Sequence, residues 1–161
     1  MPIDTRRLDS SDSPRVARWM VEHWGSEIAV AHGAVYRPAE LPGFAAVDGD
    51  EWLGLLTYHM DGDACEIVTI DSLLPNAGIG TALIEAVRQA AQQAGCRRLW
   101  LITTNDNTAA LRFYQKRGFV LAALYPNAMT RSRQLKPAIP LSGDDGIPIR
   151  DEIELEMPLS S

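Results

Sequence analysis

The turn Pro75-Asn76-Ala77-Gly78-Ile79-Gly80 joins a strand-like run to a helical pattern and lies at the centre of the predicted fold. The run Cys65–Leu73 precedes it, and an Ala-rich segment with apolar residues at helical spacing continues to Gly95. A strand that passes through two glycines directly into a helix favours phosphate binding. The backbone can approach a ligand there, and the helix start carries partial positive charge. An ordinary helix start with two flexible glycines fits equally well, so the turn alone decides nothing.

Two other phosphate-binding loops fit this turn poorly. A P-loop needs a lysine after its last glycine, where this chain has Thr81. The dinucleotide fingerprint needs a third glycine, but Leu83 stands in its place. Trp100 stands where that fingerprint needs an acid, about 20 residues further on. A nucleotide-binding α/β protein is therefore the least favoured hypothesis.

The segments around the turn predict a mixed sheet. Upstream, the runs Phe44–Val47, Trp52–Met60 and Cys65–Leu73 are separated by Asp48-Gly49 and Asp61-Gly62, and Asp-Gly favours tight hairpins. The other expected strands are Ile3–Leu8, Arg98–Thr103, Phe119–Tyr125 and a half-exposed strand over Ile153–Met157. One expected helix is capped by Asp12 or Ser13, has Pro14 at its start and ends near Gly25. A second is capped by Asn105 or Asn107 and closed by Gly118, and a third lies near Met129–Leu135. We expect a mixed α/β fold: one twisted sheet with an antiparallel N-terminal meander and helices on both faces.

Length and composition are typical of one globular domain covering residues 1–161. Of the 161 residues, 46% are apolar and 22% are charged. The formal net charge of −6 disfavours nucleic acid as the main partner. No run approaches the roughly 18 apolar residues of a membrane span, and the first residues lack the apolar stretch of a secretory signal. With Cys65 and Cys96 expected as reduced, buried thiols, we expect a cytoplasmic protein without a membrane partner.

A second stretch gives the turn its context. It reads Asn107-Thr108-Ala109-Ala110-Leu111-Arg112-Phe113-Tyr114-Gln115-Lys116-Arg117-Gly118-Phe119. Together with the meander and the glycine turn, it resembles the GNAT superfamily of acyl-CoA-dependent N-acetyltransferases, whose second motif is Asn-x-x-Ala-x-x-x-Tyr-x-x-x-Gly-Phe. The resemblance covers residues 41–125, which would form the core of a GNAT-like domain, with 126–161 as a C-terminal extension.

The resemblance implies acetyl-CoA as the co-substrate and no metal. The family's first motif, Arg/Gln-x-x-Gly-x-Gly/Ala, falls on residues 75–80, where Pro75 replaces the leading Arg or Gln. Backbone amides would then hold the pyrophosphate, and Arg112 or Arg117 could compensate for the missing donor. The cofactor-binding residues implied by the resemblance are Ile70, Ser72, Asn76, Ala77, Gly78, Ile79, Gly80, Thr81, Asn107 and Tyr114. None of the three histidines has a metal-ligand spacing, so we expect them to be solvent-facing or hydrogen-bonded.

The resemblance also implies direct attack of an acceptor amine on the thioester. Tyr114 matches the family tyrosine whose hydroxyl donates toward the CoA sulfur, although a core aromatic of the helix is the plain alternative. The resemblance makes Glu66 the candidate base, because some family members place a catalytic glutamate on this strand. Glu66 is the only charged side chain in Cys65–Ile70, and partial desolvation there would raise its pKa. Asp71 is the rival base, facing the other way unless a bulge near Ile70 resets the alternation. A water chain without a single base is the third option.

Two function hypotheses from different classes follow. The first is an N-acetyltransferase acting on the primary amine of a small molecule or peptide. The second is a non-catalytic acyl-CoA-binding or sensor domain of the same fold. The presence of Tyr114 and Glu66 favours the enzyme, whereas Pro75 favours the sensor. The resemblance implies that the acceptor pocket is bordered by acidic and aromatic residues, which suit a cationic amine: Glu22, Trp24, Glu27, Tyr36 and Tyr58. The acceptor and the oligomeric state stay open, with a homodimer through the final strand as one outcome.

Overall fold

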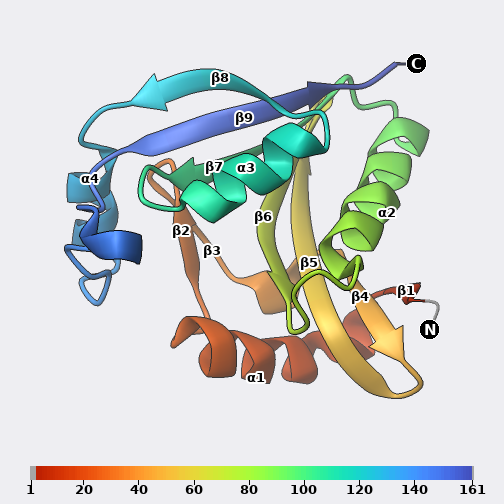
Figure 1. Cartoon of the computed structure of the whole chain (residues 1–161). Coiled ribbons are helices and arrows are strands. Elements are labelled where there is room, and N and C mark those ends of the chain that lie inside the picture. The colour runs from red at the N-terminus through yellow and green to blue at the C-terminus, as the bar shows by residue number, and fades with distance from the viewer. Residues whose placement is uncertain (1–2, 161) are drawn as a thin grey trace.

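Seven strands form one mixed sheet in the order β1-β4-β5-β6-β7-β9-β8, and β2 and β3 form a separate hairpin (Figure 1). This computed structural model describes residues 3–160. The strands are β1 (Asp4–Arg7), β2 (Ala29–Ala31), β3 (Ala34–Tyr36), β4 (Gly43–Asp48), β5 (Glu51–Asp61), β6 (Ala64–Ser72), β7 (Arg98–Thr104), β8 (Val120–Tyr125) and β9 (Glu152–Pro158). The helices are α1 (Ser13–Trp24), α2 (Ile79–Gln93), α3 (Thr108–Lys116) and α4 (Ala128–Leu135), with short 3-10 turns η1 (Ser10–Asp12), η2 (Pro38–Glu40) and η3 (Asp144–Gly146).

The predicted meander is confirmed. β4, β5 and β6 pair antiparallel, and the two hairpins turn at Gly49 and Gly62, each at φ +61°. Glycine adopts this left-handed conformation at little cost, which is why the two Asp-Gly pairs were informative. The predicted fold class, a mixed sheet with helices on both faces, is confirmed as well.

Two apolar cores lie on opposite faces of the sheet. On one face, α2 and α3 pack against the sheet through a cluster that includes Leu56, Leu83, Leu99 and Tyr114. On the other face, α1 packs through a cluster whose buried members are Val16, Trp19, Met20, Ala29, Ala45, Trp52 and Leu55. Because successive side chains of a strand point to opposite faces, the β5 neighbours Leu55 and Leu56 lie in different cores. No helix among residues 3–160 has the length and apolar character that a membrane span requires.

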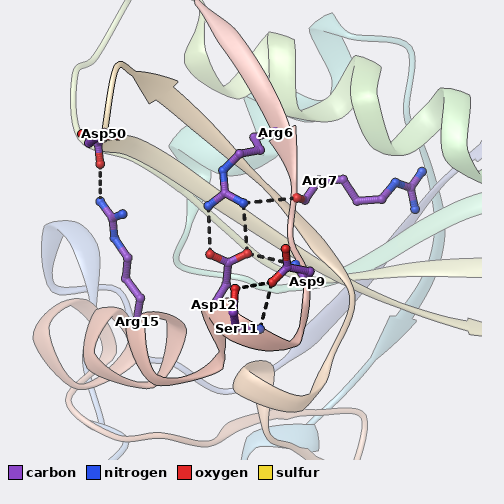
Figure 2. Close-up of polar contacts among 7 residues, drawn as sticks. All are labelled: Arg6, Arg7, Asp9, Ser11, Asp12, Arg15 and Asp50. Carbon is purple, nitrogen blue, oxygen red and sulfur yellow. Dashed lines mark hydrogen bonds and ion pairs between the residues drawn. The ribbon is translucent and has the colours of Figure 1, made fainter.

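The start of α1 differs from the prediction that the side chain of Asp12 or Ser13 caps it. Asp12 occupies the capping position, but its two carboxylate oxygens accept hydrogen bonds from Arg6 at 2.9 and 3.0 Å (Figure 2). The side-chain cap belongs to the preceding turn η1, where Asp9 accepts from the Ser11 amide at 2.8 Å. Arg15 donates to the Asp50 carbonyl at 2.7 Å and ties α1 to the β4–β5 hairpin.

The middle of β6 contains a bulge, and its far end separates from β7. Thr57 of β5 pairs with Thr69, but the next residue pairs with Ile67, which leaves Val68 as the extra residue. The bulge resets the alternation two residues before Ile70. Glu66 and Asp71 therefore lie on the same face of the sheet. β6 and β7 pair in parallel only from Ala64 to Ile67, so the sheet opens between these two strands beyond that point.

The C-terminal strand β9 lies inside the sheet, between β7 and β8, and is antiparallel to both. A half-exposed strand was predicted here, and its central residue Leu155 is fully buried. The helix near Met129–Leu135 is confirmed as α4. The hairpin β2–β3, by contrast, was not predicted at all.

Candidate functional site

A pocket of about 470 Å³ lies beside the open end of β6, between the glycine turn and α3. It is lined by Leu74, Pro75, Ala109, Ala110, Phe113, Arg117 and, of the predicted cofactor residues, Ile70, Ser72, Asn76, Ala77, Gly78, Ile79, Gly80, Thr81 and Tyr114. The predicted cofactor residue Asn107 is not part of this lining. Its side chain instead caps α3, accepting from the Ala110 amide at 3.2 Å.

The glycine turn presents the uncapped start of α2 to the pocket. Gly78 is the N-cap residue at φ +80°, and no side chain caps the helix there. The amides of the first helical turn have no partner within the helix. They are donors suited to a phosphate group, so the turn fits the pyrophosphate of CoA.

Gly80 is needed for a different reason. A Cβ atom built on it would lie 2.7 Å from Cζ of Phe113, so only glycine lets the Phe113 ring pack against this turn. This contact joins the start of α2 to α3. It holds the two walls of the pocket together.

Arg117 is the cationic side chain of the pocket. Its Nε donates to Oγ1 of Thr81 at 2.8 Å, and its guanidinium lies 3.7 Å from the centre of the Phe113 ring. Arg112, the other residue considered as a substitute for the missing Arg or Gln, is exposed and does not line the pocket. Arg117 is therefore placed where Pro75 leaves the motif without a side-chain donor.

Tyr114 reaches the pocket from α3 and is only 7% exposed. Its ring meets Phe113 and Phe119 edge-on, with centroids 5.3 and 5.5 Å away. Burial raises the pKa of Tyr114 well above its ordinary value, and the negative charge of Asp71 raises it further. The phenol is therefore a neutral O–H donor at any physiological pH.

Glu66 lies on the opposite face of the sheet from this pocket and is only 2% exposed. The β2–β3 hairpin covers it: Tyr36 donates to Oε1 at 2.6 Å, and Nε2 of His32 lies 2.9 Å from Oε2. The hydrogen bond to Glu66 raises the pKa of His32 despite the opposing effect of burial. Sequence reasoning found Glu66 but missed both partners. A Gly33 turn between two short apolar runs, Ala29–Ala31 and Ala34–Tyr36, was the only local signal.

Asp71 is also held by hydrogen bonds. Its Oδ2 accepts from the indole nitrogens of Trp19 at 3.0 Å and Trp24 at 2.8 Å, both on α1. Of the residues expected around the acceptor, Trp24 and Tyr36 thus lie on this face. Tyr58 does not, because it packs in the α2-side core against Phe44. Within residues 3–160, no group of three or more His, Cys, Asp or Glu side chains is arranged to hold a metal ion.

Comparison with known proteins gives consistent matches. The model of the acetyltransferase (GNAT) family matches residues 7–119. The chain is 50% identical over 137 residues to the uncharacterized protein YdhI of Bacillus subtilis (strain 168), covering 84% of this chain and 85% of that protein. It is 32% identical over 91 residues to streptothricin acetyltransferase of Streptomyces lavendulae, covering 56% and 44%. A GNAT family acetyltransferase from Elizabethkingia anophelis, solved with acetyl-CoA bound, matches with a TM-score of 0.70 at 21% identity, covering 98% of each chain.

Proposed function

Because this chain belongs to the acetyltransferase (GNAT) family, we propose that it is an N-acetyltransferase that transfers the acetyl group of acetyl-CoA to a primary amine. The observation that carries the proposal is the one pocket that both the uncapped start of α2 and the buried Tyr114 line. The acetyl-CoA bound to a solved structure of the same fold supports the co-substrate. The likeness to streptothricin acetyltransferase supports a small-molecule amine as acceptor, with a peptide amine as the alternative.

Different residues around the pocket bind different parts of acetyl-CoA. The amides from Asn76 to Thr81 hold the pyrophosphate, assisted by Arg117 at the pocket wall. The exposed backbone of Ile70 and Ser72, where β6 has left β7, pairs with the pantetheine arm. The Ile70 amide then polarises the thioester carbonyl.

Proton transfer completes the mechanism. Acetyl-CoA supplies an activated acetyl group, and its transfer forms a C–N bond while the C–S bond breaks. Before attack, a base on the protein removes one proton from the ammonium group. We place this base on the face of the sheet that carries Glu66. Tyr114 donates its proton to the departing sulfur, and the second proton of the nitrogen restores the phenol through solvent. Asp71 is the rival base, but its carboxylate already accepts two indole N–H groups.

The alternative function is a non-catalytic acyl-CoA-binding or sensor domain, which the Pro75 replacement favours. Steady release of free thiol from acetyl-CoA in the presence of a panel of primary amines separates the two. An enzyme releases thiol continuously with at least one amine, whereas a sensor binds acetyl-CoA without release. The panel should include cationic small molecules and short peptides. Binding of ATP or NAD in preference to acetyl-CoA would contradict both functions.

Cellular location and assembly are part of the proposal. Cys65 and Cys96 are both buried and form no disulfide, as a reducing compartment would preserve them, so we place the protein in the cytoplasm. Native mass spectrometry with acetyl-CoA added measures bound co-substrate and subunit number together. We expect one acetyl-CoA per chain. A mass of two chains would establish the homodimer.

A further inference from the structure

Two buried carboxylates converge on a single histidine outside the acetyl-CoA pocket. Glu66 of β6 is 2% exposed and Glu152 of β9 is 3% exposed. Glu66 binds the imidazole of His32 through Nε2 at 2.9 Å. Glu152 accepts from the backbone N–H of the same histidine at 3.2 Å. Buried carboxylates need partners, and His32 contacts both of them, while Tyr36 donates a further hydrogen bond to Glu66.

The backbone of His32 is held in an uncommon conformation. Its φ of +43° is in the left-handed region, which residues other than glycine seldom adopt. The guanidinium of Arg131 packs against the next residue, Gly33, where a Cβ atom would lie 2.9 Å from Cζ of that arginine. Such a conformation persists only where the surroundings determine it strongly. The hairpin is therefore built to place this imidazole rather than merely to connect two strands.

His32 is the accessible member of the pair. Its side chain is 31% exposed, while that of Glu66 is 3% exposed and lies beneath it. Both lie on the α1 face, beside the point where β6 and β7 stop pairing after Ile67. With acetyl-CoA on the α2 and α3 face, an acceptor approaches this opening from the α1 face. It meets the imidazole before it can reach the carboxylate.

We propose that His32 takes the proton from the acceptor's ammonium group, and that Glu66 is a positioning residue that orients the imidazole and stabilises its protonated form. The inference rests on the proposed acetyltransferase function and deepens it. The neutral imidazole donates its Nε2–H to Glu66, accepts one proton from the ammonium group at Nδ1 and later releases it to solvent. The nitrogen is left with the lone pair that forms the C–N bond. No covalent bond to the protein is made.

The charges around His32 fit this role. Glu66 faces it from β6, Glu152 from β9 and the Tyr36 hydroxyl from β3 at 3.2 Å, while Arg131 of α4 lies behind the hairpin turn. The Trp100 ring lies 5.3 Å from the imidazole and shields it on the β7 side. The two carboxylates outweigh desolvation by burial, and the pKa of His32 is raised from its ordinary value.

The test is the pH profile of kcat/KM with the best amine of the panel, measured for wild type, His32→Asn, Glu66→Gln and the control His59→Asn. Asparagine tolerates the left-handed backbone at position 32, and His59 is an exposed histidine on β5. We expect His32→Asn to lose about 100-fold in kcat/KM, together with the acidic limb of the profile. Glu66→Gln should keep the limb but move it to lower pH, because a neutral amide stabilises the imidazolium less. His59→Asn should match wild type.

Imidazole NMR provides a second readout that needs neither turnover nor a folded His32→Asn variant. The three histidine signals are assigned by elimination with His23→Asn and His59→Asn. We expect His32 to titrate above its ordinary pKa in wild type and lower in Glu66→Gln.

Three results would overturn the inference: a fully active His32→Asn, a limb that vanishes in Glu66→Gln but persists in His32→Asn, or an unshifted His32 titration. In each of these the proposed function stands if thiol release continues. If no amine of the panel is acetylated, the proposed function itself fails.

Discussion

Tyr114 shows how its surroundings fix the protonation state of one side chain. It is enclosed by aromatic rings from its own helix and the following turn, yet its pKa also responds to Asp71 on the other side of the sheet. β6 and β7 pair only as far as Ile67, so the sheet is open between these two strands at this level. A neutral phenol in such a place is a donor available to a group that becomes negative only late in the reaction.

We expect Tyr114→Phe to lower kcat by about 100-fold, a loss typical of a missing general acid. The phenylalanine ring keeps the contacts with Phe113 and Phe119, so the melting temperature should barely change. Acetyl-CoA affinity, measured by calorimetry, should also stay the same, since the lost contact acts mainly in the transition state. A Phe variant with full kcat would reduce Tyr114 to a packing residue.

At the residue scale, the sequence predicted which side chains belong to the candidate site better than it predicted their hydrogen-bond partners. Tyr114 and the glycine turn, both named by the family motifs, line the same pocket. The partners of Glu66 could not be predicted, because His32 and Tyr36 lie 34 and 30 positions away in the chain. The orientation of Asp71 depended on one extra residue, Val68, whose bulge leaves no mark in the sequence. Local patterns do not encode such contacts.

The start of α2 and the packing of α3 against it form one unit at the scale of elements. Gly80→Val would push the Phe113 ring away from the turn and into the pocket, because the new side chain occupies the position of the ring. We expect acetyl-CoA affinity to fall at least tenfold, about 1.4 kcal/mol, as measured by calorimetry. Gln89→Val, exposed on the same helix, controls for the helical cost of valine. Equal affinities for the two variants would contradict the assignment of the turn.

Asn107 permits a separation of two roles. Its side chain caps α3, and the family resemblance also assigns it to the cofactor. Asn107→Ala should destabilise the protein by about 1 kcal/mol in urea unfolding, whereas Asn107→Gly should cost only a few tenths. If Asn107 also contacts acetyl-CoA, both variants should lose affinity to a similar extent. An unchanged affinity of the Gly variant would limit Asn107 to capping.

Elements marked by strong turn chemistry were predicted within a few residues of their bounds. Asp48-Gly49, Asp61-Gly62 and Gly95 end their segments as expected, because positive φ favours glycine. The β2–β3 hairpin escaped detection since its strands have only three residues each, too few for an alternating pattern. Asp12 is the N-cap residue of α1, as predicted, but its side chain does not cap the helix because Arg6, from a different element, binds the carboxylate.

The molecule as a whole should lose stability as the pH rises past neutrality. The pKa of His32 is raised by its hydrogen bond to Glu66, and that of Glu152 is raised by burial, so the folded chain favours the protonated form of both. The contribution of His32 is complete below about pH 6.5 and is lost as the pH climbs through the higher folded value. The penalty for ionising Glu152 begins above its unfolded value of 4.5. Surface pairs such as Arg6 with Asp12 add little in either direction.

We therefore expect the urea midpoint of wild type to fall between about pH 6 and pH 9, and the fall to be shallower in His32→Asn. Each pKa unit of upward shift in His32 corresponds to about 1.4 kcal/mol. Lys136, whose pKa is lowered by burial, is unaltered in both proteins and serves as common background. Parallel pH profiles for the two proteins would contradict the prediction.

The position of β9 has a consequence for the order of assembly. Strand β8 is synthesised before residues 152–158, yet within residues 3–160 its only neighbour in the sheet is β9. A nascent chain that has reached α4 therefore carries an apolar strand, with Leu121 and Leu124 largely exposed even in the finished fold, and nothing to pair with it. During synthesis, β8 can join the sheet only after β9 has left the ribosome. A chain truncated before β9 would therefore be an aggregation-prone fragment with β8 unpaired, rather than a slightly shorter folded protein.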